Sequence, residues 1–260
     1  MTRVDSCGII KQEPHNARRK AVVYKALIYY DWNCHLLPGM REGIDSVDDA
    51  ISAFSFLSEL QLKKLAMMPT FDCRTESVSA FLLRRYLAME RLKPHLPSSV
   101  KIKEAARVLL TPNVHLVQDL PKLCFTKKAY LALQMPASDY DDWIDYELNR
   151  LLFHAKMKHL LFTSFELCCL FYPTEIIEKL MRIPEAVFQF HYHALTDFKC
   201  KKVMSALIKQ KSTVLFGSAL NSLERTYQFD LPYYIKSATD RMSVADYHSI
   251  LRENELFWYH

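Results

Sequence analysis

The chain has 260 residues, of which 50% are hydrophobic and 24% charged, and it contains only 4 glycines. This composition excludes a disordered or fibrous protein, and the length fits one large domain or two small ones. The 34 Lys and Arg against 29 Asp and Glu give a net charge of +5. The basic residues are spread along the chain, so nucleic acid is not expected as a partner.

The N-terminal residues and the cysteines indicate the cellular location to expect for the protein. Residues 1–20 are basic but lack the apolar stretch of a secretory signal, so we expect a flexible lead-in before one domain at 21–260. The 7 cysteines form no C-x-x-C pair, which is poor material for disulfides and favours a reducing, cytoplasmic location. The most apolar stretch, residues 160–172, is shorter than the roughly 20 residues of a membrane helix. We therefore expect no membrane span.

Runs of β-forming residues alternate with helical patterns from residue 21 onwards. A helix is predicted at 46–60, where Ser46 is a good N-cap, and 111–128 is a looser segment. This alternation predicts a parallel α/β domain, either a doubly wound sheet or a β/α barrel, and the lack of an obvious edge strand favours the barrel. The predicted strands are 21–31, 62–71, 100–110, 129–135, 159–165, 186–193 and 213–219, and the further helices are 77–93, 139–158, 173–182, 197–211 and 243–254.

Three motifs resemble those of the PHP (polymerase and histidinol phosphatase) superfamily. Residues 31–43, DWNCHLLPGMREG, match its opening D-x-H-x-H-(I/L)-(I/L)-P-G-x-D-D-G, residues 67–71, MMPTF, stand where it has T-P-H, and residues 215–221, LFGSALN, replace x-x-G-S-D-A-H. The match is closest to the manganese-dependent protein-tyrosine phosphatases of bacterial capsule and exopolysaccharide loci. The resemblance covers roughly residues 22–235 and implies a distorted (β/α)7 TIM-like barrel.

The resemblance also implies a metal cluster that needs about nine His, Asp and Glu ligands to hold phosphate and activate a water. Only His35 and Glu42 remain as possible ligands. Amide and hydroxyl side chains bring no charge, and an arginine repels a divalent ion. We therefore expect a degenerate centre without a resident cofactor, and manganese or another divalent metal if any ion binds. The replaced positions are Asn33, Thr70, Arg107, Gln134, Thr163, Ala219 and Asn221.

The sequence also allows other interpretations of individual residues. A slip of one or two positions in the third or fifth motif would bring Glu104 or Glu166 into ligand range. His191 and His193, at H-x-H spacing where a strand is predicted to end, could rebuild a metal site with His35 and Glu42. Cys34 lacks the arginine of a C-x5-R motif, so this cysteine and the pair Cys168–Cys169 are predicted to be core thiols.

Three functions follow from these observations. The favoured one is a catalytically impaired phosphatase relative with a binding or regulatory role in capsule or exopolysaccharide biosynthesis. It would engage a phosphotyrosine-bearing capsule-assembly kinase or its tail, with Arg107 holding the phosphate. The second is an active metal-dependent phosphotyrosine-protein phosphatase with a reduced or rebuilt metal site. The third is an unrelated α/β enzyme, although the chain has neither a G-x-S-x-G elbow nor a nucleotide-binding loop.

Overall fold

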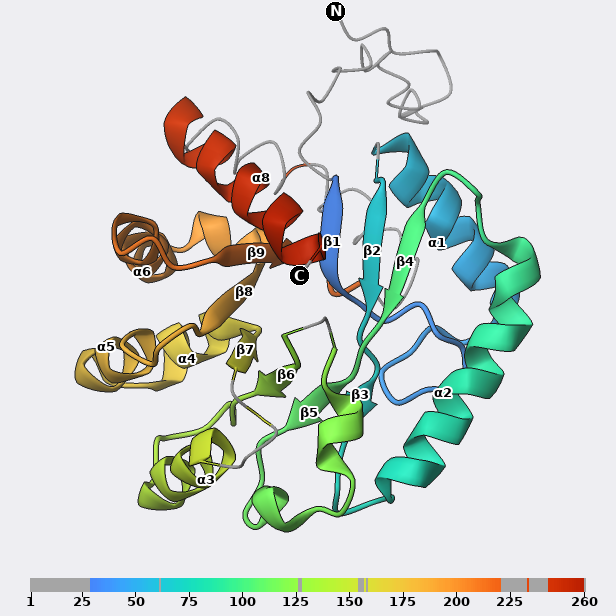
Figure 1. The fold of residues 1–260 in the computed structure, drawn as a ribbon. Helices are drawn as coiled ribbons and strands as arrows, with labels where there is room; N and C mark the ends of the chain where they lie inside the picture. The colour runs from blue at the N-terminus through green and yellow to red at the C-terminus, as the bar shows by residue number, and fades with distance from the viewer. Residues whose placement is uncertain are drawn as a thin grey trace, which may run out of the picture.

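The computed structural model describes residues 29–60, 62–125, 128–153, 157, 159–220, 233 and 243–259. The predicted lead-in at 1–20, most of the first predicted strand and Asn221 lie outside these residues. Within them, strands and helices alternate along the chain as predicted (Figure 1). None of the described helices is both long and apolar enough to cross a membrane.

The strands form two sheets in which every pairing between strands is parallel. One sheet has the order β1-β2-β4 and the other β3-β5-β6-β7-β8-β9. The parallel α/β architecture expected from the sequence is therefore present. The strands are β1 (Tyr30–Cys34), β2 (Lys64–Met67), β3 (Thr70–Phe71), β4 (Lys101–Glu104), β5 (Arg107–Leu109), β6 (Tyr130–Gln134), β7 (His159–Thr163), β8 (Val187–His191) and β9 (Val214–Gly217).

Two predicted strands are each divided between the two sheets. The run 62–71 becomes β2 and β3, and the run 100–110 becomes β4 and β5. Backbone hydrogen bonds continue across both breaks, because Ala105 N donates to Met67 O at 2.9 Å and Arg107 N donates to Pro69 O at 3.0 Å. These two segments therefore bend together from one sheet into the other and hold the sheets side by side.

The remaining edges of the two sheets approach each other where β1 and β9 end. Ala219 N donates to Asn33 O at 2.8 Å, and His35 N donates to Leu220 O at 3.0 Å. Within the described residues the backbones of β1 and β9 are hydrogen-bonded to each other only at these ends, and the two strands are not paired along their length. A closed seven-stranded barrel is therefore not confirmed, although the strands surround a common centre (Figure 1).

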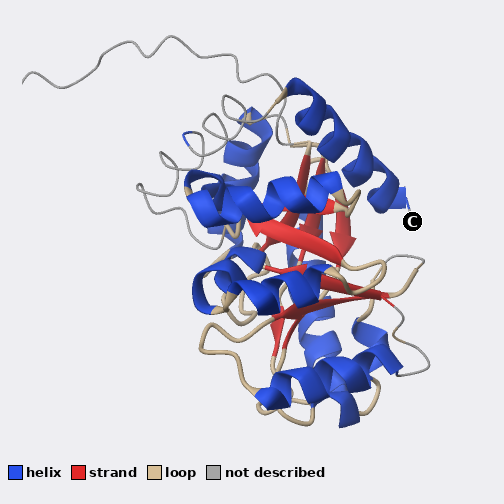
Figure 2. Cartoon of the chain, turned by 90° about the vertical axis from the view of Figure 1, so that its left-hand side faces the viewer, coloured by secondary structure: helices blue, strands red, loops and turns tan. Residues whose placement is uncertain are grey.

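Helices cover the outside of the strands (Figures 1 and 2). Three begin at a side chain that caps a backbone N–H, namely Ser46, Ser77 and Asp197. The helix α4 was not predicted: the strand expected at 159–165 ends at Thr163, and α4 begins two residues later. In the described part of the looser segment 111–128, the helical structure consists of short 3-10 turns. The helices are α1 (Val47–Glu59), α2 (Val78–Leu92), α3 (Asp142–Phe153), α4 (Phe165–Phe171), α5 (Thr174–Met181), α6 (Phe198–Lys209) and α8 (Val244–Tyr259), with 3-10 turns η1 (Lys93–His95), η2 (Val114–Leu116), η3 (Leu120–Leu123) and η4 (Tyr192–Thr196).

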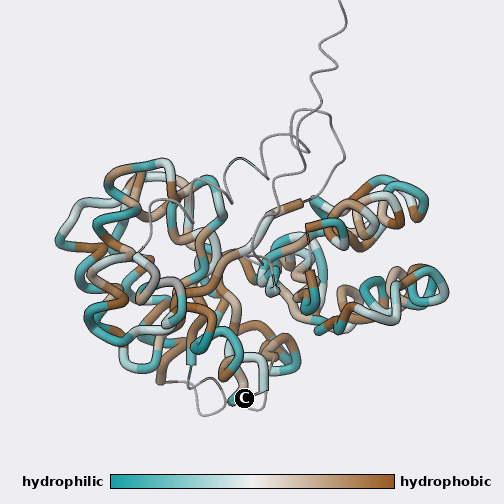
Figure 3. The backbone as a smooth tube through the Cα atoms, turned by 90° about the horizontal axis from the view of Figure 1, so that it is seen from above, coloured by the Kyte–Doolittle hydropathy of each residue, from teal (hydrophilic) through white to brown (hydrophobic). Residues whose placement is uncertain are grey.

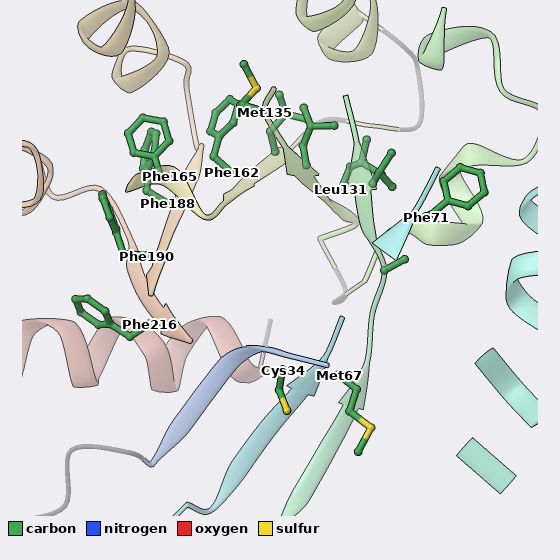
Figure 4. Packing of buried hydrophobic residues seen from close by; sticks show 14 of the residues in the cluster. Cys34, Met67, Phe71, Leu131, Met135, Phe162, Phe165, Phe188, Phe190 and Phe216 are labelled. Atoms are coloured by element: carbon green, nitrogen blue, oxygen red, sulfur yellow. The ribbon is translucent and has the colours of Figure 1, made fainter. Parts of the chain in front are cut away.

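The core has two layers, because alternate residues of a strand point to opposite faces. One layer lies between strands and helices, where Phe162, Phe188 and Phe190 point away from the common centre (Figure 4). In Figure 3 the hydrophobic colour follows these inner strands, and more hydrophilic segments lie outside. The second layer contains Ala132, Leu161, Val187 and Leu215, each two residues before a polar or small residue of the same strand.

The helix α8 closes the end of this inner layer at which the strands begin. Phe257 and Trp258 pack on Trp32, with ring centroids 5.0 and 5.3 Å from the indole. The Trp32 Nε1 donates to Asn254 Oδ1 at 2.5 Å, although the two residues are 222 positions apart in the chain. Since α8 covers this end, the opposite end, where the strands finish, is the place for a binding site.

Gly217 is required where β9 meets β1. A Cβ at this position would lie 2.7 Å from both the Cβ and the backbone N of Asn33. We predict that Gly217→Ala lowers the free energy of unfolding by about 2 kcal/mol, measured by urea denaturation, because the two strands must move apart. As a control, Ala219→Gly changes the same segment by one methyl at a residue with φ of 54°. This control is expected to stay within about 1 kcal/mol of the wild type. A Gly217→Ala protein with the same free energy of unfolding as the wild type would show that the close approach of the two strands is not needed.

Candidate functional site

The predicted site residues gather at the end of the strands opposite α8. Asn33, Gln134, Thr163 and His191 lie in the last two residues of their strands. Thr70 and Arg107 begin β3 and β5, which continue the bent segments described above, and Glu42 bonds to both. His35 and Ala219 follow the ends of β1 and β9. We call this end of the strands the mouth, defined by these residues and by Glu166 and His193.

Arg107 occupies one side of the mouth and is fully engaged with two predicted site residues. The residue is only 4% exposed. Its Nη2 donates to Thr70 Oγ1 at 2.6 Å and forms an ion pair with Glu42. The Thr70 hydroxyl in turn donates to Glu42 Oε2 at 2.9 Å. Burial lowers the pKa of Arg107 and Glu42 raises it, but a guanidinium stays charged in proteins, so the mouth carries a fixed positive charge.

These residues do not fit the multinuclear manganese cluster that the resemblance implies. The guanidinium of Arg107 lies among the positions assigned to ligands, where it repels a divalent cation. Glu42, the retained acidic ligand position, is already paired with that guanidinium. Ala219 has no donor atom in its side chain. Such a cluster needs several anionic ligands, and these positions supply only one carboxylate.

His35 lies deeper in the mouth and is a neutral imidazole. It is 4% exposed, and burial together with the neighbouring Arg107 and His191 lowers its pKa well below the ordinary value. Its Nδ1 has no hydrogen-bond partner among the described residues, and the same holds for Asn33 Oδ1 and Gln134 Oε1. Buried polar atoms are rarely left without a partner. These three atoms therefore indicate that the mouth is built to receive water or a polar ligand.

His191 is held through both nitrogens of its ring. Its Nε2 lies 3.1 Å from Asn33 Nδ2, and its Nδ1 lies 2.6 Å from Glu166 Oε1. Because the Asn33 amide nitrogen can only donate, Nε2 acts as the acceptor and the proton lies on Nδ1, facing Glu166. The same amide nitrogen donates to Gln189 Oε1 at 3.1 Å. The ring of His191 is therefore fixed in both orientation and tautomer.

Glu166, His191 and His193 form a group with the spacing of metal ligands. One ligand atom from each residue lies within 4.8 Å of the other two, and within the described ranges this is the group of His, Cys, Asp and Glu with that spacing. The sequence allowed a rebuilt site of His191 and His193 with His35 and Glu42, and the structure places Glu166 beside the two histidines. Burial raises the pKa of Glu166 but the facing His191 outweighs it, so the carboxyl is ionised. Burial lowers the pKa of His193.

Two further polar residues of the site were not identified from the sequence. Gln189 Oε1 accepts from Ser164 N at 2.9 Å as well as from Asn33, so it joins β1, β7 and β8 at the mouth. Ser164 has φ of 52° at the turn from β7 into α4, and its Oγ lies 3.5 Å from His191 Nε2. Gln189 is a polar residue inside an otherwise apolar predicted strand, and this pattern could have identified it from the sequence. Nothing in the sequence indicated the left-handed turn at Ser164.

The other singled-out residues lie outside this site. Glu104 is paired with Arg85 of α2 at 3.5 Å, away from the mouth. Cys34, Cys168 and Cys169 are buried, as predicted for core thiols. Burial raises the pKa of Cys34 and of Cys168 well above the ordinary value, so these thiols are protonated and unreactive.

Comparison with known proteins supports the fold. No protein-family model and no curated protein matches the sequence. A solved structure matches with a TM-score of 0.58 over 89% of this chain and 95% of the other, at 16% sequence identity. It comes from work on YwqE from Bacillus subtilis and CpsB from Streptococcus pneumoniae, which are described as unique metal-dependent tyrosine phosphatases. At this level of identity the likeness establishes the fold and leaves the activity open.

Asp31, the first residue of the opening motif, makes the stability of the mouth depend on pH. It is completely buried, and burial raises its pKa from 3.8 to about 6. Because the folded protein holds this proton more tightly than the unfolded chain, stability falls as the pH rises from about 4 to above 6. The pKa difference corresponds to about 3 kcal/mol.

The variant Asp31→Asn removes this titration and keeps an oxygen for the backbone N–H of Ser218, which lies 2.9 Å from Asp31 Oδ1. We predict that the stability of the variant relative to the wild type rises by about 3 kcal/mol between pH 4 and pH 7.5 in urea denaturation. If the stability difference between Asp31→Asn and the wild type is the same at both pH values, Asp31 has an ordinary pKa in the folded protein.

Proposed function

We propose that this protein is a relative of the metal-dependent tyrosine phosphatases that binds a phosphotyrosine-type phosphomonoester at the mouth without hydrolysing it through their metal cluster. The observation that carries the proposal is the Arg107 guanidinium, paired with Glu42 and Thr70 where the resemblance assigns metal ligands. The shared fold supports the relationship. The biological role would be binding or regulation in capsule or exopolysaccharide biosynthesis.

The chemistry of the mouth suits a phosphoryl group. A guanidinium is the side chain best matched to phosphate oxygens, and burial strengthens its pull on a dianion. The side chain of Glu42 is 43% exposed, so it can leave Arg107 for water when a phosphate arrives. Asn33 Oδ1 and Gln134 Oε1 have no partner among the described residues, and a half-turn of the Gln134 amide would present its nitrogen to the ligand. The phosphotyrosine tail of a capsule-assembly kinase is the partner that we propose.

The same residues argue against turnover by the family mechanism. A metal-bound water would be the nucleophile in that mechanism. The positions that would hold the ions carry an arginine, amides, hydroxyls and an alanine, which do not fit a cluster of cations. Cys34 is buried and its thiol is protonated, so it is not a replacement nucleophile. Binding without hydrolysis is the activity that this arrangement supports best.

A second candidate function is an active metal-dependent phosphotyrosine-protein phosphatase with a rebuilt metal site. The group formed by Glu166, His191 and His193 favours it, because three such ligands with an open fourth position are typical of catalytic metal sites. The two functions differ in whether added metal produces turnover.

We predict that turnover of p-nitrophenyl phosphate and of a phosphotyrosine peptide stays at background with Mn²⁺, Mg²⁺ or Co²⁺. The physical reason is that the cluster which would activate water cannot form around Arg107. The measurement is the initial rate of phosphate release, compared with protein treated with a chelator. A clear metal-dependent rate that Glu166→Gln abolishes would replace the first candidate function by the second.

Binding offers a test with opposite outcomes for the two members of the ion pair. We predict that Arg107→Met abolishes binding of a phosphotyrosine peptide, whereas Glu42→Gln tightens it by about tenfold, since the peptide no longer competes with a carboxylate. The measurement is isothermal titration calorimetry.

The control is Arg150→Met, because Arg150 lies on α3 against the ring of Tyr146, outside the mouth. It should leave the affinity for the peptide unchanged. Equal weakening by Arg107→Met and Glu42→Gln would contradict the proposal, because it would mean that the intact ion pair, and not the free guanidinium, is what the peptide needs.

A further inference from the structure

We propose that Glu166, His191 and His193 bind one divalent transition-metal ion of the Zn²⁺ class. This site differs from the ligand positions that the resemblance assigns, where Arg107 and Glu42 form their ion pair. The inference goes beyond the proposed function and does not depend on whether the mouth hydrolyses a phosphoester.

The ligand atoms of the three residues are spaced almost as they would be around a bound ion. His191 Nδ1 and Glu166 Oε1 are 2.6 Å apart, and the rings of His191 and His193 have centroids 5.5 Å apart. One ligand atom of each residue lies within 4.8 Å of the other two. An ion with bonds of about 2.0–2.2 Å to nitrogen and oxygen needs its ligand atoms slightly more than 3 Å apart. Small side-chain rotations supply that change.

The surroundings already hold two of the ligands in place. Glu166 is 3% exposed, and His191 N donates to its second oxygen, Oε2, at 3.2 Å. When an ion replaces the proton on His191 Nδ1, the ring proton moves to Nε2, and the Asn33 amide, 3.1 Å away, turns its otherwise unpartnered Oδ1 toward Nε2 to accept it. Histidines that bind metals usually have such a partner on the other nitrogen. The site is therefore supported from behind.

The exposure of the three residues indicates how the ion enters. His193, on the turn η4, is exposed, whereas Glu166 and His191 are buried. An ion can thus reach the group from solvent on the His193 side. Three protein ligands leave a fourth position open for water or for an oxyanion.

The ligand types select the metal. Two imidazoles and one carboxylate suit Zn²⁺ and similar transition ions, whereas Mg²⁺ prefers oxygen ligands alone. Zn²⁺ has no geometric preference of its own and accepts a site with three ligands and one water. We therefore expect Zn²⁺ to bind tightly and Mg²⁺ not to compete with it.

The experiment measures metal content in the full-length protein. Protein dialysed against Zn²⁺ and then against a weak chelator is expected to retain about one equivalent of zinc, measured by inductively coupled plasma mass spectrometry. His193→Ala and Glu166→Gln should each lower the retained zinc at least tenfold. A tenfold excess of Mg²⁺ should leave the zinc content of the wild type unchanged.

A matched control is available elsewhere in the chain. His115 Nδ1 lies 2.7 Å from Glu147 Oε2, so it forms a partly buried histidine–glutamate pair that does not belong to the three-residue group. His115→Ala should keep the zinc. Circular dichroism of each variant shows that loss of zinc does not come from unfolding.

The outcomes separate this inference from the proposed function. Retention of zinc by folded His193→Ala and Glu166→Gln would overturn the inference, as would a wild type that retains no zinc, and neither result bears on peptide binding by Arg107. Conversely, Glu42→Gln and Arg107→Met should keep their zinc. Loss of zinc in these two variants would place the ion at the Arg107 side of the mouth and would also overturn the inference.

Discussion

The ion pair between Arg107 and Glu42 determines what the mouth can do. A nearly buried guanidinium is stable only if it is paired and hydrogen-bonded, and Glu42 and Thr70 provide both. Once this positive charge is present, neighbouring positions cannot collect several divalent cations. Its charge also helps to lower the pKa of His35, so that the buried imidazole stays neutral beside it. The ion pair is thus the feature on which our proposal of phosphate binding without a metal cluster depends.

The rest of the fold keeps this pair in position. The bent segments β2–β3 and β4–β5 carry Thr70 and Arg107 to the mouth, and a hydrogen bond from Arg107 N to Pro69 O joins them. At the other end, α8 packs against Trp32 and fills the space below the mouth. One end of the strands is therefore closed by apolar packing, and the open end concentrates the polar residues that a ligand would contact.

The sequence predicted the order of most strands and helices and the end of the strands at which the candidate site residues lie. It did not predict the breaks after Met67 and Glu104, because an apolar run looks the same whether a strand is straight or bent. It offered a site of His191 and His193 with His35 and Glu42 only as an alternative, and did not place Glu166 beside them. The left-handed turn at Ser164 starts α4 early and brings Glu166 against His191, and a single serine in the sequence gives no sign of such a turn. Whether Arg107 would meet Glu42 depended on contacts between distant segments, which residue patterns do not reveal.

The most direct test of the central claim is the anomalous diffraction of crystals grown with Mn²⁺. The account predicts no manganese peak between His35 and Glu42, with the guanidinium of Arg107 in contact with Glu42 and Thr70. A manganese peak bound by His35 and Glu42, with Arg107 turned away from them, would contradict it.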